Sequence, residues 1–293
     1  NSANPEVTII DVSSIAAGSS QVKVQFYYHD NDYWGWYWAV DDVELYVPEA
    51  NDLKLNSIHW GSTGFWAERL AYYQVPASQV TEIEFSGVVE NIGAQDQQDA
   101  VFTATVGAFS SASAATPVLV GNIDTLACNA SFTPGSATAT LSLSGAVTMG
   151  NNDGDATNNA LANFASIAIN PYVYSRDNGT ALNGSFNGGM GFEVGNIFDI
   201  FANTNIGGGS VYINGAAEVG TEMYLKLYSI DPATGDFVYV DETGPYVLTT
   251  NDIDAEVTLS FLGGSYPLNA GESYLLVAGS NGDGGATTLT PRR

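Results

Sequence analysis

Short runs of alternating apolar and polar residues recur along the whole chain, and turn-forming residues separate them. Windows with an apolar residue at every third or fourth position, the spacing of an amphipathic helix, are scarce. Gly, Asn, Asp and Pro bound the runs, as they commonly bound β-strands. We therefore predict an all-β protein built of tandem β-sandwiches. The expected strands include residues 22–28, 82–85, 101–106, 137–143, 223–228 and 274–278.

Polar stretches divide the chain into three blocks. The first block, residues 1–48, is too short for an independent sandwich, which needs about 100 residues. We expect it to be part of a larger domain or to be completed by another chain. The second block, residues 52–170, closes with a polar loop at 150–159 and a strand near 164–169. The third block, residues 171–293, is predicted to be a further β-sandwich, complete or truncated.

The composition is acidic but rich in apolar residues. The 293 residues include 7 Lys+Arg and 32 Asp+Glu, which gives a formal net charge of −25. Because 45% of the residues are hydrophobic and 12% aromatic, the chain does not belong to the disordered acidic class. The scarce cations argue against charge-driven binding to nucleic acid or to an anionic membrane. No apolar run approaches the roughly 20 residues of a membrane-spanning helix, so we predict no membrane insertion.

Motifs that carry catalysis are missing from the sequence. Gly-x-Ser-x-Gly, His-Glu-x-x-His and the phosphate-binding Walker loop do not occur. The single cysteine, Cys128, precludes an intrachain disulfide, and neither His29 nor His59 forms a recognisable motif with it. We expect a buried, inert thiol and predict that the chain is not an enzyme.

Two regions are rich in aromatic residues. In the first, strand alternation would place Trp34, Trp36 and Trp38 on one face. An exposed row of Trp rings is a candidate carbohydrate platform, and the alternative is burial in a sandwich core. The second region is expected in the core of the second block, with a domain junction or a contact with a neighbour as the alternatives. It comprises Trp60, Phe65, Trp66, Tyr72 and Tyr73.

Residues 22–30 and 34–43, together with the preceding residues 10–16, carry a family resemblance. They resemble the closing strands of choice-of-anchor J and cleaved-adhesin jelly rolls, so the first block looks like the C-terminal part of such a domain. Those modules occur in large surface and secreted proteins of Bacteroidota exported by type IX secretion. The resemblance implies an extracellular or cell-surface location, and modules that serve adhesion, spacing or attachment.

The other two blocks resemble further modules of the same proteins. At residues 51–53, 87–93 and 155–159 the second block is similar to immunoglobulin-like modules of the CARDB or fibronectin type. Residues 174–179 and 271–275 look like a further β-module. The resemblance implies an immunoglobulin-like sandwich followed by another β-sandwich.

Structural Ca²⁺ is the one cofactor expected. In jelly rolls that the first block resembles, an acidic residue at the position of Asp41 and Asp42 helps to hold Ca²⁺. Adjacent strand residues face opposite sides, so at most one of the two enters a site easily. The alternative is that one of them faces solvent and the other caps a turn. The loop with Asp153 and Asp155 has the oxygen density of a Ca²⁺ site. It lacks the twelfth-position Glu and the flanking helices of an EF-hand, so a plain inter-strand loop is the alternative.

One modification site is suggested by a short motif. Asp124-Thr125-Leu126 resembles the acceptor motif for O-glycosylation in exported Bacteroidota proteins. The resemblance implies a glycan on Thr125.

Three functions fit these observations. The leading hypothesis is a non-catalytic structural or adhesive segment of a large extracellular protein. The second is a subunit of an extracellular filament that is completed by strand exchange between chains. The third is an accessory module of a secreted hydrolase whose catalytic domain lies outside this segment. The expected partners are neighbouring domains, copies of the chain, glycans, and host or cell-surface proteins.

Overall fold

The computed structural model describes residues 8–10, 12–31, 33, 39–178 and 191–282. The chain divides into two compact units, Asn1–Val47 and Pro48–Arg293. Each unit is described by itself below.

The first unit contains one short helix, α1 (Ser13–Ala16), and no strand among its described residues. The strand predicted at residues 22–28 is therefore wrong. Its apolar side chains are exposed, with Val24 at 59% and Phe26 at 50% of their full accessibility. The alternation at 22–28 is real, but a β-strand is stable only when a neighbour accepts its hydrogen bonds.

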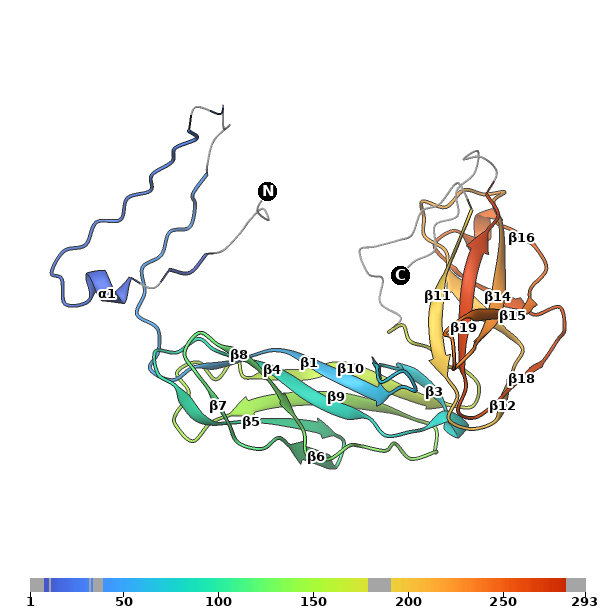
Figure 1. The fold of residues 1–293 in the computed structure, drawn as a ribbon, viewed down its shortest axis with the longest axis horizontal. Coiled ribbons are helices and arrows are strands. Elements are labelled where there is room, and N and C mark those ends of the chain that lie inside the picture. Colours follow the sequence, from blue (N-terminus) through green and yellow to red (C-terminus); the bar gives the residue numbers. More distant parts are fainter. Residues whose placement is uncertain (1–7, 11, 32, 34–38, 179–190, 283–293) are drawn as a thin grey trace. The chain divides into compact units, whose positions relative to one another are not determined.

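The second unit begins with a β-sandwich over residues 53–170, named the first sandwich here (Figure 1). One sheet has the order β2-β1-β4-β8 and the other β3-β10-β9-β5-β6, with β7 also paired to β5. The strands pair antiparallel, except that β3 lies parallel to β10. The 3-10 turn η1 (Ala77–Gln79) follows β3. The first sheet contains β1 (Leu53–Thr63), β2 (Arg69–Leu70), β4 (Glu84–Asn91) and β8 (Ile123–Ala127). The second contains β3 (Gln74–Pro76), β5 (Gln97–Val106), β6 (Phe109–Ala112), β7 (Thr116–Val118), β9 (Ala139–Thr148) and β10 (Ala160–Asn170).

The core of the first sandwich lies between these sheets. Leu53, Phe102 and Ile167 are completely buried there, and they come from both sheets. Along β5 the buried residues alternate with more accessible ones from Ala100 to Val106, as expected for a sheet with one face in a core.

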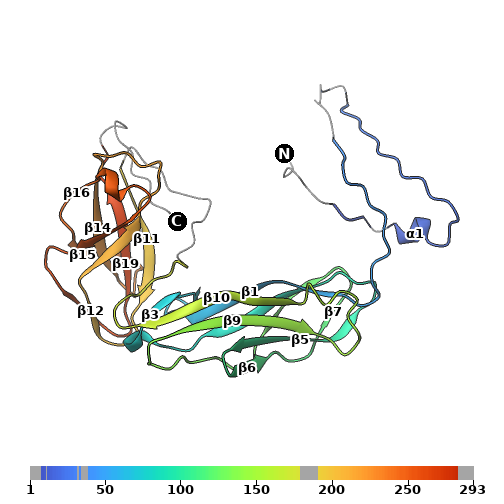
Figure 2. The same ribbon diagram turned by 180° about the vertical axis from the view of Figure 1, so that it is seen from behind.

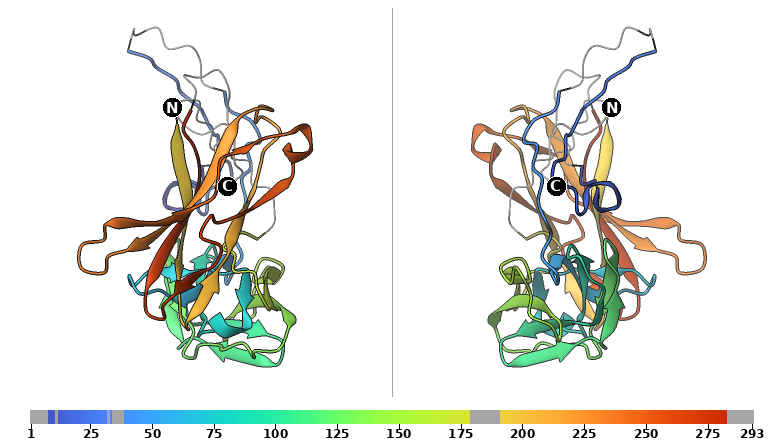
Figure 3. Two further views of the ribbon diagram at one scale, coloured as in Figure 1. Left: turned by 90° about the vertical axis from the view of Figure 1, so that its right-hand side faces the viewer. Right: turned by 90° about the vertical axis from the view of Figure 1, so that its left-hand side faces the viewer.

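Residues 192–280 form the second sandwich (Figure 2). Its main sheet has the order β11-β19-β14-β15, with β16 also paired to β14. Two separate ribbons, β12-β18 and β13-β17, supply the remaining strands. The strands, shown from two further sides in yellow to red in Figure 3, are β11 (Phe192–Asp199), β12 (Thr204–Ile206), β13 (Gly208–Tyr212), β14 (Glu222–Ile230), β15 (Phe237–Glu242), β16 (Tyr246–Val247), β17 (Glu256–Ser260), β18 (Tyr266–Leu268) and β19 (Ser273–Ser280). The 3-10 turn η2 (Thr250–Asp252) lies between β16 and β17.

Two apolar clusters fill the second sandwich. One surrounds Met223 and Leu225, and the other surrounds Leu227 and Tyr274. All four side chains are buried and come from the central strands β14 and β19. The all-β fold class predicted from the sequence is thus confirmed. Within the described ranges, every helix is too short or too polar to cross a lipid bilayer.

Candidate functional sites

The residues proposed from the sequence for calcium fall into two places. Asp41 and Asp42 are exposed, and the Asp42 backbone nitrogen donates a hydrogen bond to Asp41 Oδ1 at 2.9 Å. Asp153 and Asp155 lie in the loop between β9 and β10. Nowhere in the part of the chain that the structure describes do three His, Cys, Asp or Glu side chains gather as a metal site. Occupancy by calcium stays a prediction.

The β9–β10 loop is held by its own carboxylates. Asp153 Oδ2 accepts hydrogen bonds from the Leu53 backbone nitrogen at 3.1 Å and from Asn159 Nδ2 at 2.9 Å. Its Oδ1 accepts one from the Asp155 backbone nitrogen. Asp155 Oδ1 in turn accepts hydrogen bonds from Thr157, which lower the pKa of the Asp155 carboxyl. Asp153 therefore joins this loop to the start of β1.

The carboxyl of Asp52, beside this loop, lies where a negative charge is unfavourable. Asp52 is buried, and its Oδ1 accepts a hydrogen bond from Asn158 Nδ2 at 3.0 Å. Burial raises the pKa of Asp52, and the charges of Asp153, Asp155 and Glu49 raise it further, although the Asn158 hydrogen bond acts in the opposite direction. The negative charge on Asp52 thus opposes folding at neutral pH.

This position gives a pH-dependent prediction. Because the pKa of Asp52 is higher in the folded than in the unfolded chain, its favourable contribution is present at low pH and is lost as the pH rises through the folded-state pKa. We expect Asp52→Asn to raise the melting temperature at pH 7 and to change it little below the unfolded-state pKa of aspartate. Thermal unfolding followed by circular dichroism across that range tests this. A lower melting temperature at pH 7 would contradict it.

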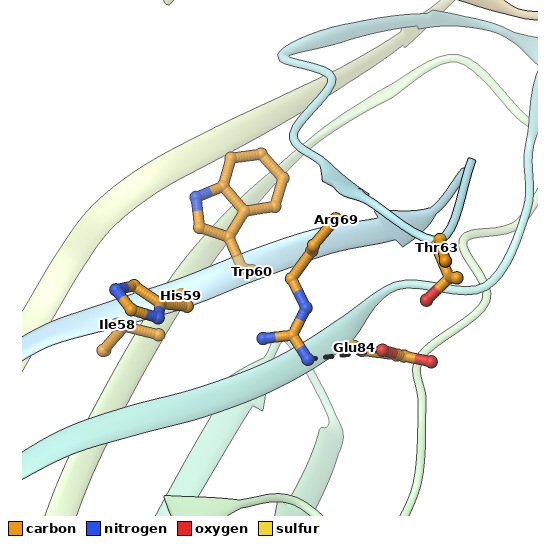
Figure 4. A pocket seen from close by; sticks show the side chains of 7 residues that line it. Ile58, His59, Trp60, Thr63, Arg69 and Glu84 are labelled. Atoms are coloured by element: carbon orange, nitrogen blue, oxygen red, sulfur yellow. Dashed lines mark hydrogen bonds and ion pairs between the residues drawn. The ribbon is translucent and has the colours of Figure 1, made fainter. Parts of the chain in front are cut away.

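A cavity of about 590 Å³ opens beside β1 and β2 (Figure 4). Arg69 spans it, with Nη2 3.3 Å from Glu84 Oε2 and Nη1 2.7 Å from Ser86 Oγ. Only one carboxylate, Glu84, is among the lining residues, and it is already paired, so the lining does not provide the two carboxylates of a glycosidase. The lining residues are Ile58, His59, Trp60, Thr63, Ala67, Arg69 and Glu84.

This cavity was not anticipated from the sequence. Arg69 is one of only 7 cationic residues, which is a weak signal, and its neighbours on β1 and β4 become adjacent only in the folded sheet. Since Arg69 already contacts Glu84 and Ser86, it offers a paired cation rather than a free one. The ion pair is partly exposed and is worth at most about 1 kcal/mol.

An extensively hydrogen-bonded polar site lies where the two sandwiches meet. Asp199, at the end of β11, is completely buried. Its Oδ2 accepts a hydrogen bond from the Phe65 backbone nitrogen at 3.0 Å, and its Oδ1 accepts one from Ser273 Oγ. The Asp199 backbone nitrogen donates to the Tyr72 hydroxyl at 3.0 Å, and its carbonyl accepts from the Tyr174 hydroxyl.

Two further side chains cross the same junction. Gln79, which is 1% exposed, accepts a hydrogen bond from the Phe201 backbone nitrogen at 2.9 Å and donates one to the Ala202 carbonyl at 2.7 Å. Trp66 Nε1 donates to Ser273 Oγ at 3.1 Å. Both ends of the buried Gln79 amide are hydrogen-bonded. Breaking either bond would leave a polar group unpaired in apolar surroundings, so the amide both stabilises the junction and holds residues 201–202 in place.

Aromatic rings complete the junction. Tyr72 stacks on Tyr174 with ring centroids 4.4 Å apart, and Phe198 packs against both. Burial raises the pKa of both tyrosines, so each keeps its hydroxyl proton. Phe198 and Phe201 also pack against the core of the first sandwich. The junction defined by Asp199, Gln79, Tyr72, Tyr174 and Phe198 is therefore partly an extension of that core.

The second aromatic region of the sequence is divided between core and junction. Trp60 is buried and meets Tyr73 edge-on, with ring centroids 5.1 Å apart, within the first sandwich. Phe65 packs on Phe201, and Trp66 reaches Ser273. The core and the junction predictions thus each hold for different residues of this region.

The remaining sequence candidates are placed as follows. Cys128 is half-buried rather than buried, and its thiol donates to the Ser111 carbonyl. Burial raises the pKa of this thiol, which disfavours the reactive thiolate. Thr125 is exposed on β8, opposite Val88 on β4, and its modification stays a prediction. The proposed carbohydrate platform of Trp34, Trp36 and Trp38 lies outside the described residues.

Comparisons with known proteins give weak similarities. No family model and no curated protein matches the sequence. The chain is similar to the CARDB domain of a Pyrococcus furiosus protein, solved in complex with di-metal ions, with 12% identity and a TM-score of 0.30 over 45% of this chain and 98% of that one. It is also similar to a two-domain protein of unknown function from Bacteroides fragilis, with 10% identity and a TM-score of 0.20 over 83% of this chain and 95% of that one.

Proposed function

We propose that the chain is a non-catalytic structural segment of a large extracellular or cell-surface protein and contributes to adhesion. The observation that supports this most is the junction between the two sandwiches. Modules on a flexible linker share few buried contacts, whereas Asp199 and Gln79 are almost completely buried and hydrogen-bonded across the boundary. Two sandwiches coupled in this way keep a fixed orientation to each other, which suits a spacer or a scaffold that holds a binding site away from the cell surface.

Adhesion and surface exposure test this proposal together. Protease added to intact cells that express the full-length protein should cleave the chain from their surface. The purified chain should bind glycans or host proteins in a screen. The absence of both results would overturn the proposal. Surface exposure without binding would leave the structural role and remove the adhesive one.

A second candidate function is that of a filament subunit completed by strand exchange. It is favoured by residues 22–28, whose alternating apolar side chains are exposed and which belong to none of the sheets of the described residues. Such a segment can add to an open sheet edge of another chain. Because the net charge of −25 opposes self-association, assembly should increase with salt. Sedimentation showing only monomer at high concentration and high salt would exclude it.

A structural Ca²⁺ at the β9–β10 loop is part of the proposal. Ca²⁺ prefers hard oxygen ligands. Among the described atoms, Asn158 Oδ1 and Asn159 Oδ1 are buried without a hydrogen-bond partner, and the amide nitrogens of these residues donate to Asp52 and Asp153. This donor set fits an oxygen-bound cation. For Asp41 and Asp42, the same proposal rests on the resemblance alone.

Calcium is therefore expected to raise the melting temperature, and EDTA to lower it, because the cation offsets the mutual repulsion of Asp52, Asp153 and Asp155. Differential scanning calorimetry with and without chelator measures the effect. Asp155→Asn should reduce the response, whereas Asp231→Asn in the β14–β15 turn should not. A melting temperature unchanged by excess EDTA would remove calcium from the proposal.

A further inference from the structure

A group of aromatic rings, two exposed and one half-buried, lies on the second sandwich, on the side of the main sheet that faces away from the core. The inward side chains of β14, such as Leu225 and Leu227, are buried. Alternation along the strand directs Tyr228 to the opposite face. On the neighbouring edge strand β15, Phe237 is 57% exposed and Tyr239 is 53% exposed.

These three rings form one continuous surface, named the aromatic platform here: Tyr228, Phe237 and Tyr239. The Tyr228 ring centroid lies 6.3 Å from that of Tyr239 and 6.4 Å from that of Phe237. Strand pairing places Tyr239 directly opposite Tyr228, after a register shift between Leu227 and Tyr228. The irregularity in the ladder thus brings the two tyrosines into a direct cross-strand pair.

A carboxylate on β11 fixes the position of Tyr228. Glu193 Oε2 accepts a hydrogen bond from the Tyr228 hydroxyl at 2.7 Å. Its Oε1 accepts hydrogen bonds from Lys226 Nζ at 2.7 Å and from the Tyr224 hydroxyl at 3.1 Å. Lys226 Nζ also lies 4.3 Å from the centre of the Tyr224 ring. Tyr228 is therefore held in place before any ligand arrives, which reduces the entropy lost on binding.

The charges around the aromatic platform limit what it can bind. Lys226 is the nearby cation, and it is paired with Glu193. Glu242 lies directly across the strand pair from Lys226, and Asp241 precedes it on β15. An anionic ligand would meet carboxylates and an already neutralised lysine. A ligand with many hydroxyl donors and no charge would meet ring faces for stacking and carboxylates as acceptors.

We propose that Tyr228, Phe237 and Tyr239 bind a neutral polysaccharide by stacking on its sugar rings. This rests on the adhesive role in the proposed function and gives it a ligand class. The site differs from the Trp34, Trp36 and Trp38 platform predicted from the sequence. The Tyr228 ring plane is inclined by 81° to that of Tyr239 and by 52° to that of Phe237, so the rings present faces at different angles along two strands. This arrangement suits a chain of several sugars rather than one monosaccharide.

Affinity electrophoresis of the full chain in gels that contain soluble neutral polysaccharides tests the proposal, with heparin as the anionic comparison. The probes are a β-glucan, a mannan and a xylan. We expect retardation by at least one neutral polymer and none by heparin. Phe237→Ala and Tyr239→Ala should each weaken binding roughly tenfold. The matched control is Val238→Ala, which changes an equally exposed apolar residue between them on β15.

Two variants separate stacking from general apolar contact and from misfolding. Tyr239→Phe keeps the ring and should retain most of the binding, whereas Tyr239→Leu keeps apolar area without a ring and should lose it. Binding that is lost equally in the Val238, Phe237 and Tyr239 variants would overturn the proposal, as would binding to none of the neutral polymers. Sedimentation of the same proteins shows whether this edge pairs copies of the chain instead; a dimer that these changes dissolve, without glycan binding, also overturns it.

The outcome can be told apart from failure of the adhesive role itself. If the purified chain still binds cells after Phe237→Ala and Tyr239→Ala, the adhesive role is retained and the proposal for the aromatic platform is overturned. If the unmodified chain binds neither cells nor glycans, the adhesive role falls with it.

Discussion

Asp199→Ala is expected to lower the free energy of unfolding by about 2–4 kcal/mol, because the change leaves one buried and one partly buried hydrogen-bond donor without an acceptor. A buried donor that loses its acceptor costs about 1–3 kcal/mol, and a partly buried one costs less. The two donors are the Phe65 backbone nitrogen and Ser273 Oγ. Since Phe65 belongs to the first sandwich and Ser273 to the second, the loss should also uncouple them. Urea denaturation followed by tryptophan fluorescence and circular dichroism should then show two transitions.

Asp231→Ala is the matched control for this prediction. Asp231 also accepts a backbone hydrogen bond, from Ala233 at 2.8 Å, but in an exposed turn, so its removal should cost about 1 kcal/mol or less. Asp199→Asn keeps one acceptor oxygen and should fall between the two. Equal stability of the Asp199→Ala and Asp231→Ala proteins would show that the junction does not couple the sandwiches.

The strands were predictable where alternation and turn residues act locally. Residues 101–106 lie within β5, and residues 223–228 and 274–278 lie within β14 and β19. Residues 22–28 have the same alternation and form no strand, because pairing depends on a partner that local pattern does not reveal. Periodicity reports which face a strand would bury, and not whether a sheet exists for it to join.

The junction and the aromatic platform could not be predicted from the sequence, because their residues are far apart in the chain or meet only through the register of a sheet. Trp66 and Ser273 are 207 residues apart, and Phe65 and Asp199 are 134 apart. Asp199 is one of 32 acidic residues, and nothing local separates it from those on the surface. Tyr239 becomes the partner of Tyr228 only through a register shift in the sheet. Contacts that depend on topology and register cannot be derived from spacing along one chain.

Phe102→Ala is expected to destabilise the first sandwich by about 3–5 kcal/mol, the usual cost of removing a buried phenylalanine ring. Phe102 is completely buried and fits between Gly145 on the adjacent strand β9 and Gly87 on β4 of the facing sheet. A Cβ added at Gly145 would lie 2.8 Å from Phe102 Cε2, and one added at Gly87 would lie 2.7 Å from Phe102 Cγ. The ring thus fills space that only glycine leaves free on both β4 and β9.

That reciprocal fit makes a double-mutant cycle decisive. Gly87→Ala alone should cost about 1–3 kcal/mol through overpacking, but it should cost much less when Phe102 is already alanine or leucine, because the clashing ring is gone. Gly135→Ala is the control, since an added Cβ there meets nothing within 4 Å. Phe102→Leu serves in the cycle if the alanine variant does not fold. Additive costs in urea denaturation would contradict the packing of Phe102 against Gly87. A coupling of 1 kcal/mol or more, on the order expected for residues in contact, would establish that the packing of the Phe102 ring requires a glycine at position 87 of β4.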